Sequence, residues 1–546
     1  MDAGETGSGV EIGDWWRRAV VYQIYPRSFQ DSNGDGIGDL QGIIDRLDYV
    51  NDGTDRSLGV DAIWLSPTFP SPMKDFGYDV SDYCDVHPDF GDLAAMDRLI
   101  DECHRRGIRL LLDWAPNHSS DQHPWFIESR ASRDSPRRDW YYWRDPKPDG
   151  APPNNWRSVF GGPAWTIDAR TGQYYLHSFL KEQPDLNWRN PEVVQAMHDV
   201  LRFWMERGVD GFRIDVLGMI VKHPDLPDNP INPDYEPSMP DTHKVLDHHS
   251  LNYPDVFDAV AGIRRVLDEY PGRMAVGEVF GPADVIARYH GGEALDGLHL
   301  AFNFQLLVHD GVQSPWDSEF MRGVVSALES SLPDGAQPCY ALGNHDQPRL
   351  ASRHNHDGRG QERSRAAALL LLGVRSTPFL YYGEELGMVD VDIPEDRLQD
   401  PARFYHHGRD PERTPMQWDA SAGRGFTEGE PWLPFGPVEI NVAAQQDDPG
   451  SLLSLYRDAL RIRRDEPSLH AGELRDIDSP TGTFVFVRHA AGARAIHCAI
   501  NTTVEPIDIA LPEGAMSVLL ATDRALDGLP VTGSFTVPAL GAAWIG

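Results

Sequence analysis

Eight short apolar runs constrain the fold of this chain more than any other feature of its sequence. They span residues 19–25, 60–66, 108–114, 209–215, 274–279, 298–304, 338–342 and 377–382. Each run has the length and apolar character of a buried strand, and stretches with a helical pattern, such as 93–106, 191–207 and 257–270, lie between most of them. Strands that alternate with helices form parallel sheets, and eight such units close into a barrel. The sequence therefore predicts an α/β fold built on a (β/α)₈ TIM barrel.

Two regions of the sequence do not follow the barrel repeat. The interval between the third and fourth runs is too long for one helix and is rich in Trp, Pro and Gly, which predicts an inserted subdomain over the barrel mouth. Near the end of the chain, short alternating runs replace the helical pattern and predict a small antiparallel β domain. We expect the barrel at 1–116 and 188–470, the inserted subdomain B at 117–187 and the C-terminal β domain at 471–546.

Charge and cysteine usage exclude several classes of partner. Asp and Glu number 84 against 49 Lys and Arg, so the net charge is -35, which argues against binding to nucleic acid or to an anionic membrane. The four cysteines are scattered and form no CxxC motif, so neither a zinc site nor a disulfide scaffold is expected. The longest apolar stretch, 366–374, is too short to cross a bilayer, and residues 1–13 lack the pattern of a signal peptide. We expect a cytoplasmic monomer or small homo-oligomer that acts on a small molecule.

Three acidic residues lie at the ends of three predicted strands. Asp215 ends the fourth run, Glu278 follows the apolar stretch of the fifth, and Asp346 comes soon after the seventh. A single acid in such a place is more often part of a salt bridge or a helix cap, but three of them at the catalytic end of a barrel favour chemistry. A pair of carboxylates cleaves glycosides because one protonates the leaving oxygen while the other attacks or shields the sugar carbon.

The neighbours of two of these acids suggest different roles for them. Arg213 precedes Asp215 by two positions and so shares its face of the strand, where a guanidinium would keep the carboxylate ionised, as a nucleophile requires. Glu278 lies between Val276 and Val279, and apolar surroundings raise the pKa of a carboxyl group, as a general acid requires.

Further polar and aromatic side chains are expected at the same mouth. His118 and His345 lie close to the predicted strand ends and are candidates to hydrogen-bond sugar hydroxyls, although a lone loop histidine is more often an ordinary polar residue. Tyr78, Phe160 and Phe179 lie in segments expected to overhang the mouth. Aromatic rings there would stack on the C–H faces of a sugar, whereas large aromatic residues elsewhere in the chain mostly fill cores.

The segment 31–39, DSNGDGIGD, has oxygen-bearing side chains at alternating positions and Gly at the sixth. This spacing matches the first half of a calcium-binding loop, but Gly42 occupies the twelfth position, where an EF-hand has Glu. The sequence therefore predicts a shorter structural cation site, with a turn that binds no metal as the alternative. Its ligands would be Asp31, Asn33, Asp35, the carbonyl of Ile37 and Asp39.

An ordered set of short motifs resembles the α-amylase superfamily of glycoside hydrolases, in its oligo-1,6-glucosidase and α-glucosidase branch. The motifs are 22–29 (YQIYPRSF), 113–118 (DWAPNH), 211–216 (GFRIDV), 277–279 (GEV), 344–346 (NHD) and 413–418 (RTPMQW), and the resemblance covers nearly the whole chain. It implies that Asp215 is the nucleophile, Glu278 the general acid/base and Asp346 the stabiliser of the transition state.

The same resemblance assigns the residues around these acids. An ion pair between Asp75 and Arg409 would close the glucose pocket and make the enzyme exo-acting, and the Asp31 loop would hold structural Ca²⁺ or Mg²⁺. Val216, directly after the nucleophile, resembles the pattern of enzymes that cleave α-1,6 bonds. The remaining residues that the resemblance places on the pocket wall are Tyr78, His118, Phe160, Phe179, Gln183, Arg213 and His345.

Three functions remain open at this point. The first is a retaining, exo-acting α-glucosidase that releases glucose from short oligosaccharides and disaccharides, with α-1,6 preferred over α-1,4 bonds. The second is a glucosyl transferase or sugar isomerase of the trehalose or isomaltulose synthase type, which differs in whether water or another sugar intercepts the glucosyl intermediate. The third is a non-catalytic carbohydrate-binding or transporter-associated protein, which predicts a missing catalytic acid or an added membrane helix.

Overall fold

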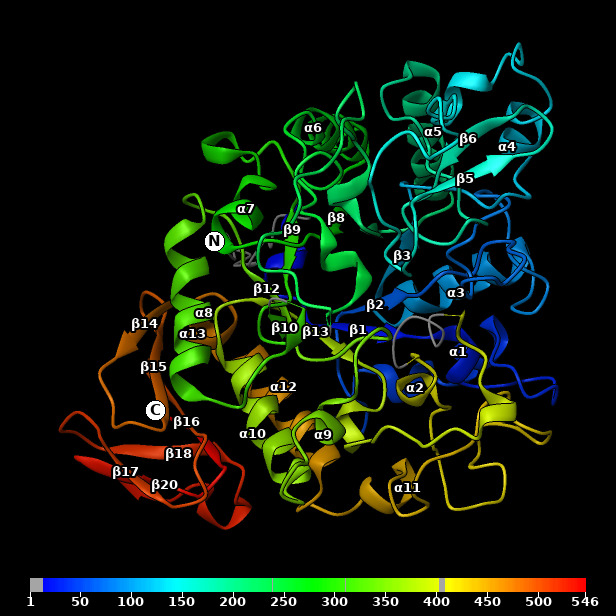
Figure 1. Cartoon of the computed structure of the whole chain (residues 1–546). Coiled ribbons are helices and arrows are strands. Elements are labelled where there is room, and N and C mark those ends of the chain that lie inside the picture. Colours follow the sequence, from blue (N-terminus) through cyan, green and yellow to red (C-terminus); the bar gives the residue numbers. More distant parts are fainter. Residues whose placement is uncertain (1–12, 238, 310, 402–407) are drawn as a thin grey trace, which may run out of the picture.

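The computed structural model describes residues 13–237, 239–309, 311–401 and 408–546, and Figure 1 shows the arrangement of their elements. Eight parallel strands close into a barrel in the order β1-β13-β12-β9-β8-β7-β3-β2. Each predicted apolar run contains one of these strands, so the TIM barrel is confirmed. The strands are β1 (Val21–Ile24), β2 (Ala62–Leu65), β3 (Arg109–Trp114), β7 (Gly211–Ile214), β8 (Met274–Gly277), β9 (Leu300–Asn303), β12 (Cys339–Ala341) and β13 (Thr377–Tyr381).

Helices surround the barrel and cover the outer face of its strands (Figure 1). Their ends follow local sequence signals: the Asp92 side chain accepts a hydrogen bond from the Ala95 amide at the start of α3, and Asn190 caps α5 ahead of Pro191. The acidic, glycine-rich start of the chain, 1–12, lies outside the described residues. The α-helices are α1 (Leu40–Asp45), α2 (Leu47–Val50), α3 (Leu93–Arg105), α4 (Pro124–Ser129), α5 (Pro191–Glu206), α6 (Val256–Leu267), α7 (Ala283–Arg288), α8 (Ser318–Ser331), α9 (Leu350–Arg353), α10 (Gly360–Gly373), α11 (Val442–Gln445), α12 (Leu452–Asp465) and α13 (Pro467–His470).

The long interval between β3 and β7 contains the insertion that its composition predicts. A three-stranded antiparallel sheet in the order β4-β6-β5 is formed by β4 (Trp143–Arg144), β5 (Trp165–Asp168) and β6 (Gln173–Leu176). Trp156 and Trp165, the first residue of β5, are buried in one apolar cluster with Leu226 from the loop after β7. The insertion therefore has a small apolar cluster of its own, whereas Trp140 and Trp143 belong to the main core.

A sheet of antiparallel strands ends the chain, as predicted. Its order is β14-β15-β16-β21-β18-β19, and β17 pairs separately with β20. The limits proposed above for each domain stay a prediction. The strands are β14 (Glu473–Ile477), β15 (Thr483–His489), β16 (Ile496–Asn501), β17 (Ile507–Ala510), β18 (Met516–Ala521), β19 (Pro530–Val531), β20 (Ser534–Val537) and β21 (Ala542–Ile545), and a separate hairpin of the barrel region comprises β10 (Val308–His309) and β11 (Val312–Gln313).

Helix α10 joins the barrel to the C-terminal sheet. Residues 366–373 of this helix are all buried, and the helix contacts β16 and β21 as well as α12. The Trp544 indole donates to the Leu369 carbonyl at 3.1 Å, and a Cβ atom at Gly373 would lie 2.9 Å from the same indole nitrogen. The longest apolar stretch of the sequence is thus an internal helix. Among the described residues, none of the helices has the length and apolar character required to cross a membrane.

Candidate active site

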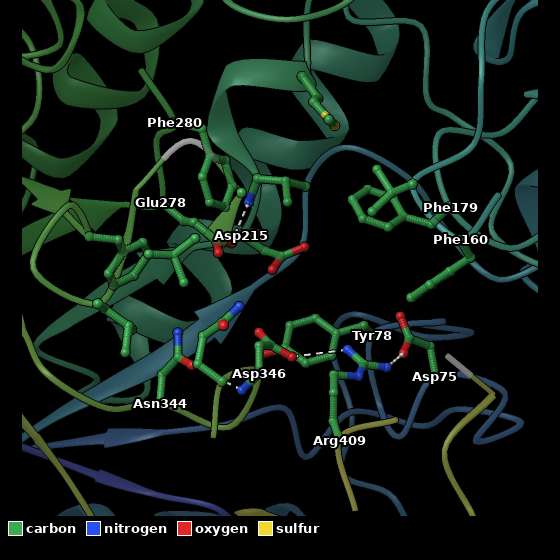
Figure 2. A pocket seen from close by; sticks show the side chains of 18 of the residues that line it. Asp75, Tyr78, Phe160, Phe179, Asp215, Glu278, Phe280, Asn344, Asp346 and Arg409 are labelled. Carbon is green, nitrogen blue, oxygen red and sulfur yellow. Dashed lines mark hydrogen bonds and ion pairs between the residues drawn. The ribbon is translucent and has the colours of Figure 1, made fainter. Parts of the chain in front are cut away.

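A pocket of about 820 Å³ opens at the carboxyl ends of the barrel strands, where catalysis takes place in this architecture. Asp215, Glu278 and Asp346 all line it, as Figure 2 shows. Asp215 and Glu278 are the residues directly after β7 and β8, and Asp346 lies in the loop after β12. The three acids that the sequence places at strand ends therefore border one cavity.

One guanidinium connects two of these acids. Arg213 in β7 is fully buried, and it donates through Nη1 to Asp215 Oδ1 at 2.7 Å and through Nη2 to Glu278 Oε2 at 2.6 Å. Its Nη1 also contacts Asp113 Oδ1 at 2.9 Å. Strand register explains the grouping, because Asp113 of β3 and Val276 of β8 are the direct neighbours of Arg213. Three carboxylates from adjacent strands share one cation.

The pKa values of Asp215 and Glu278 are both raised. Burial raises the pKa of Asp215 well above its ordinary value; Arg213 acts in the opposite direction, and Glu278 adds to the rise. Burial likewise raises the pKa of Glu278, with Arg213 opposing and Asp346 adding to the effect. The sequence suggested that Arg213 would keep Asp215 ionised, but this cation is divided among three carboxylates and does not outweigh burial. Asp215 and Glu278 thus retain a proton between them at a pH where exposed acids have lost theirs.

Asp346 has the opposite electrostatic environment. Burial raises its pKa, but His345, Arg409 and Arg413 outweigh burial and hold the pKa of Asp346 well below its ordinary value. Arg409 Nη1 and Arg413 Nη2 both lie 2.9 Å from Asp346 Oδ1. Asp346 is therefore ionised at neutral pH.

The turn after Asp215 is strained, and its backbone amides bind the second acid, Glu278. Val216 has φ 37° and ψ 42°, in the left-handed region that a β-branched residue rarely adopts. This turn places the Val216 amide 3.1 Å from Glu278 Oε2 and the Leu217 amide 3.0 Å from the Glu278 carbonyl oxygen. The backbone that follows one acid thus fixes the position of the other.

An ion pair lies on one side of the pocket. Arg409 Nη2 lies 2.7 Å from Asp75 Oδ1, which is the contact that the resemblance implies. Gln183 Nε2 supports the pair by donating to Asp75 Oδ2 at 3.0 Å, and the Arg409 guanidinium lies 5.4 Å from the centre of the Phe160 ring. Sequence reasoning missed Asp400, which also binds Arg409, through Nε and Nη2, at 2.9 Å.

The predicted wall residues divide into two groups. Asp75, Tyr78, His118, Phe160 and Phe179 line the pocket, as do Val216 and Arg409. The structure places Arg213, Gln183 and His345 behind this wall, where they bind the lining side chains rather than face the cavity.

Tyr78 and the two histidines are held by buried hydrogen bonds. Tyr78 donates to Asp113 Oδ2 at 2.9 Å, and its oxygen lies 2.7 Å from Nε2 of His345, on which its ring stacks. Burial lowers the pKa of His345 to about 3 and that of His118 to about 4. Both imidazoles are therefore neutral at physiological pH. The two ring nitrogens of His118 contact the side-chain amides of Asn117 and Gln183, each at 3.1 Å.

The Asp31 loop lies outside the pocket. Asp31 is buried and accepts from the amides of Gly34 and Gly36 at 2.7 and 2.8 Å, while Asp39 caps α1 by accepting from the Gly42 amide. Asn33 and Asp35 are exposed. The Oδ1 atom of each accepts a hydrogen bond from the backbone amide two residues later. The donors are all oxygen atoms, which suits a hard cation, although the described residues include no ready-made cluster of three acidic, histidine or cysteine side chains for a metal ion.

Comparison with known proteins identifies the family. The family model described as "Alpha amylase, catalytic domain" matches residues 23–472. A probable alpha-glucosidase of Rhizobium meliloti is 42% identical over 91% of this chain and 91% of its own length. An oligo-1,6-glucosidase of Heyndrickxia coagulans is 42% identical over 82% of this chain and 85% of its own.

Solved structures agree with this result. The crystal structure of an alpha-glucosyl transfer enzyme has a TM-score of 0.89 and 40% identity and covers 98% of this chain and 99% of its own. The trehalulose synthase of Pseudomonas mesoacidophila has a TM-score of 0.86 and 35% identity, with 97% of this chain and 99% of its own covered. The chain belongs to the alpha-amylase family, as a glycoside hydrolase of the α-glucosidase and oligo-1,6-glucosidase type.

Proposed function

We propose that this protein is a retaining, exo-acting α-glucosidase that removes glucose from the non-reducing end of short oligosaccharides and disaccharides, with α-1,6 bonds preferred. One observation carries the proposal: Asp215 and Glu278 contact the two terminal nitrogens of the same guanidinium in a pocket that also contains Asp346. Neighbouring carboxylates of this kind suit a retaining mechanism, in which one attacks directly. The named relatives, an α-glucosidase and an oligo-1,6-glucosidase, support the substrate class.

In the first step, the carboxylate of Asp215 attacks the anomeric carbon while Glu278 gives its proton to the leaving oxygen. In the second step, Glu278 takes a proton from water, the water oxygen bonds to the anomeric carbon, and the bond to Asp215 breaks. Asp215 and Glu278 retain one proton between them, and the first step requires that this proton is on Glu278. The ionised Asp346 would accept hydrogen bonds from the ring hydroxyls and stabilise the positive charge that develops on the sugar.

The closed end of the pocket supports the exo mode of action. Asp75 and Arg409 form their 2.7 Å contact between Gln183 on one side and Phe160 on the other. A chain that continued past the terminal glucose would have to break this ion pair, and breaking a buried pair is costly.

The preference for α-1,6 bonds rests on Val216. Its side chain lines the pocket directly beside Asp215, and a branched side chain there narrows the space next to the leaving sugar. An α-1,6 linkage has one more rotatable bond than an α-1,4 linkage and passes this constriction more easily.

A panel of disaccharides tests the proposed reaction. Glucose should be released from isomaltose faster than from maltose, and its first anomer should be α, because two inversions at one carbon give retention. Asp215→Ala should lower kcat by about 10⁴-fold or more while leaving the unfolding transition in place. β-Glucose as the first product, or substantial turnover by the Asp215→Ala protein, would contradict the assignment.

A second candidate is a glucosyl transferase or a sugar isomerase. It is favoured by the likeness to an alpha-glucosyl transfer enzyme and to a trehalulose synthase, with TM-scores of 0.89 and 0.86. Hydrolysis and glucosyl transfer share the glucosyl-Asp215 intermediate, and they differ in whether water or a sugar attacks it. Sucrose distinguishes them, because hydrolysis yields glucose and fructose whereas isomerisation yields a rearranged disaccharide. The non-catalytic alternative predicted a missing acid, but all three acids are present and line the pocket.

We also propose that the Asp31 loop holds a structural Ca²⁺ or Mg²⁺. Its oxygen donors support this, and the 2.5 Å hydrogen bond from Thr427 to Asp31 ties the loop to a distant part of the chain. Removal of divalent cations by a chelator should lower the unfolding temperature, and added Ca²⁺ should restore it. Asp35→Ala should abolish this response, whereas Asp134→Ala, at another exposed loop aspartate, should retain it. An unchanged unfolding temperature after chelation would exclude the cation.

The proposed location is the cytoplasm. Cys84, Cys103, Cys339 and Cys498 are all free thiols, which is the usual state in a reducing compartment.

A further inference from the structure

A second cavity lies at the amino-terminal end of the barrel, opposite the catalytic acids. Its volume of about 400 Å³ is within the range of small-molecule sites. Residues at the starts of β1, β2 and β3 line it, together with the last turns of α12 and α13. The apolar side chains inside the barrel separate it from the catalytic pocket, which lies at the other ends of the same strands. We call it the basal cavity.

The basal cavity is lined mainly by cations. Its described lining contains one acid, Asp61, and four arginines: Arg18, Arg109, Arg463 and Arg464. In the whole chain Asp and Glu outnumber Lys and Arg by 84 to 49, so this local excess of positive charge is opposite in sign to the charge of the molecule. Cations gathered around a concave site attract an anionic ligand.

Ordinary structural roles account for only part of this charge. Arg109 Nη1 lies 2.9 Å from Asp210 Oδ1. Arg464 Nη2 donates to the Gly59 carbonyl at 3.1 Å, and Arg464 also lies in the last turn of α12, where a cation is favourable. Arg18 is exposed, and its guanidinium has no hydrogen-bond or ion-pair partner among the described residues. It is therefore available to a ligand.

Arg463 is a buried cation that no acid of the described chain contacts directly. It is 1% exposed, and its terminal nitrogens donate to the carbonyl oxygens of Leu372, Leu469 and Ser376 at 2.8, 2.9 and 2.6 Å. Burial lowers the pKa of Arg463 to about 10, with Asp61 opposing the effect, so the guanidinium is still charged at neutral pH. Because a buried charge without a counter-ion is costly, an anion in the adjoining cavity would stabilise it.

The positive potential extends to His470, the last residue of α13. Burial lowers the pKa of His470, and Arg18, Arg463 and Arg488 lower it further. Its Nδ1 is buried and has no hydrogen-bond partner within the described ranges. The imidazole is therefore neutral at neutral pH, and it adds no charge that would need a counter-ion of its own.

The basal cavity also has room and apolar surface for an organic group. Its volume exceeds that of a phosphate group several-fold, and Trp15, Val20 and Leu460 belong to its lining. The guanidinium carbon of Arg109 lies 5.7 Å from the centre of the Trp15 ring, so cationic and aromatic surface lie side by side. A ligand that joins an anion to a ring would contact both kinds of surface.

We propose that the basal cavity binds a small phosphate ester, with its phosphate group at the arginines and its organic part against Trp15. Arg18 and Arg464, which are both exposed, would donate to the phosphate oxygens, and a guanidinium can make two parallel hydrogen bonds to such a group. The buried Arg463 would act through its charge. Binding requires neither Asp215 nor Glu278, since these acids lie at the other end of the barrel.

Calorimetric titration of the full-length protein, in a phosphate-free buffer of low ionic strength, tests the proposal. The probe is ribose 5-phosphate, which has no glucosyl unit for the catalytic pocket, and ribose and inorganic phosphate are titrated separately. Ribose 5-phosphate should bind about tenfold more tightly than inorganic phosphate, which is the gain that one apolar contact typically gives, and ribose should bind most weakly of the three. No binding of ribose 5-phosphate at millimolar concentration, or equal binding of ribose, would overturn the proposal. Equal binding of inorganic phosphate would overturn the role of Trp15.

A matched pair of variants locates the ligand. Arg18→Gln should weaken binding of ribose 5-phosphate about tenfold, as expected for the loss of one charge-assisted hydrogen bond, and it should leave the unfolding temperature unchanged. Arg170 is likewise exposed, has no hydrogen-bond or ion-pair partner in the described part of the chain and does not line the basal cavity. Arg170→Gln should therefore leave the affinity unchanged. Equal affinities for the two variants would place the ligand elsewhere and overturn the proposal.

Salt dependence tests the electrostatic origin of the affinity. Raising the NaCl concentration from about 20 mM to about 200 mM should weaken binding of ribose 5-phosphate about threefold or more, because salt screens charges at exposed sites. An affinity that does not change with salt would overturn the role of the arginines. Hydrolysis of isomaltose by Arg18→Gln should equal that of the wild-type protein, and binding at the basal cavity should persist in Asp215→Ala. Loss of phosphate-ester binding in Asp215→Ala would place the ligand in the catalytic pocket and overturn the proposal.

Discussion

At the residue scale, the site depends on a few side chains that serve more than one partner. Arg213 contacts Asp113, Asp215 and Glu278, and Arg409 contacts Asp75, Asp346 and Asp400. Each cation lies among acids that would otherwise repel one another, and each buried acid is costly without the cation. The two arginines therefore determine the charge state of the pocket as well as its shape.

The strain at Val216 predicts an unusual order of stability. Gly adopts the left-handed region without penalty, whereas Ala does not, so Val216→Gly should be more stable than Val216→Ala by about 1 kcal/mol. Val279 is also buried, but its φ is not positive, and there the Ala variant should be the more stable of the two. Chemical denaturation of the four proteins measures both differences. If the Ala variant were the more stable of the two at position 216 as well, the Val216 turn would store no strain.

The raised pKa of Glu278 predicts that the catalytic acid costs stability at neutral pH. An acid whose pKa is higher in the folded than in the unfolded state is penalised above its folded pKa, and the penalty is absent below the unfolded value of about 4.3. Glu278→Gln should therefore stabilise the protein by about 1 kcal/mol at pH 7, and the gain should vanish near pH 4. Calorimetric unfolding across this range measures it. A gain that grew as pH fell would mean that the pKa of Glu278 is lowered, not raised.

At the element scale, the barrel strands were predictable because strands covered on both faces by other elements read as continuous apolar runs. The insertion was predictable because the interval is too long for one helix. The C-terminal sheet was predictable because short alternating apolar runs replace the helical pattern there. The left-handed turn at Val216 was not predictable, since a β-branched residue disfavours that conformation. It exists because the backbone on both sides is fixed by the neighbouring strands.

Helix α10 offers a test of how the barrel and the C-terminal sheet fit together. A Cβ atom at Gly373 would lie 2.9 Å from the Trp544 indole nitrogen and 3.4 Å from the Cys498 sulfur. Gly373→Ala should therefore destabilise the protein by about 1 to 3 kcal/mol. Gly323 of α8 has nothing within 4 Å of such an atom, so Gly323→Ala should stabilise by up to about 1 kcal/mol. Thermal unfolding compares the two, and a stabilising Gly373→Ala would show that the interface is loosely packed.

At the scale of the whole molecule, the sequence predicted which acids lie together, but it did not predict all of the contacts between these acids and the neighbouring cations. Asp215, Glu278 and Asp346 were found from their places at strand ends, and the Asp75–Arg409 pair from the family resemblance. Asp400 lies in an irregular loop that has no periodicity, so no local signal marked it as a third contact of Arg409.

The ion pair between Asp75 and Arg409 borders the pocket on the side away from Phe280. In the proposed mechanism the leaving group departs while the glucosyl unit is still bonded to Asp215, so the two products depart in a fixed sequence and the glucose bound against that pair goes last. Free glucose should then compete with incoming substrate, whereas the first product to depart should inhibit in a different pattern. The glucosyl unit held between the ion pair and Asp215 thereby sets the kinetic order of the cycle.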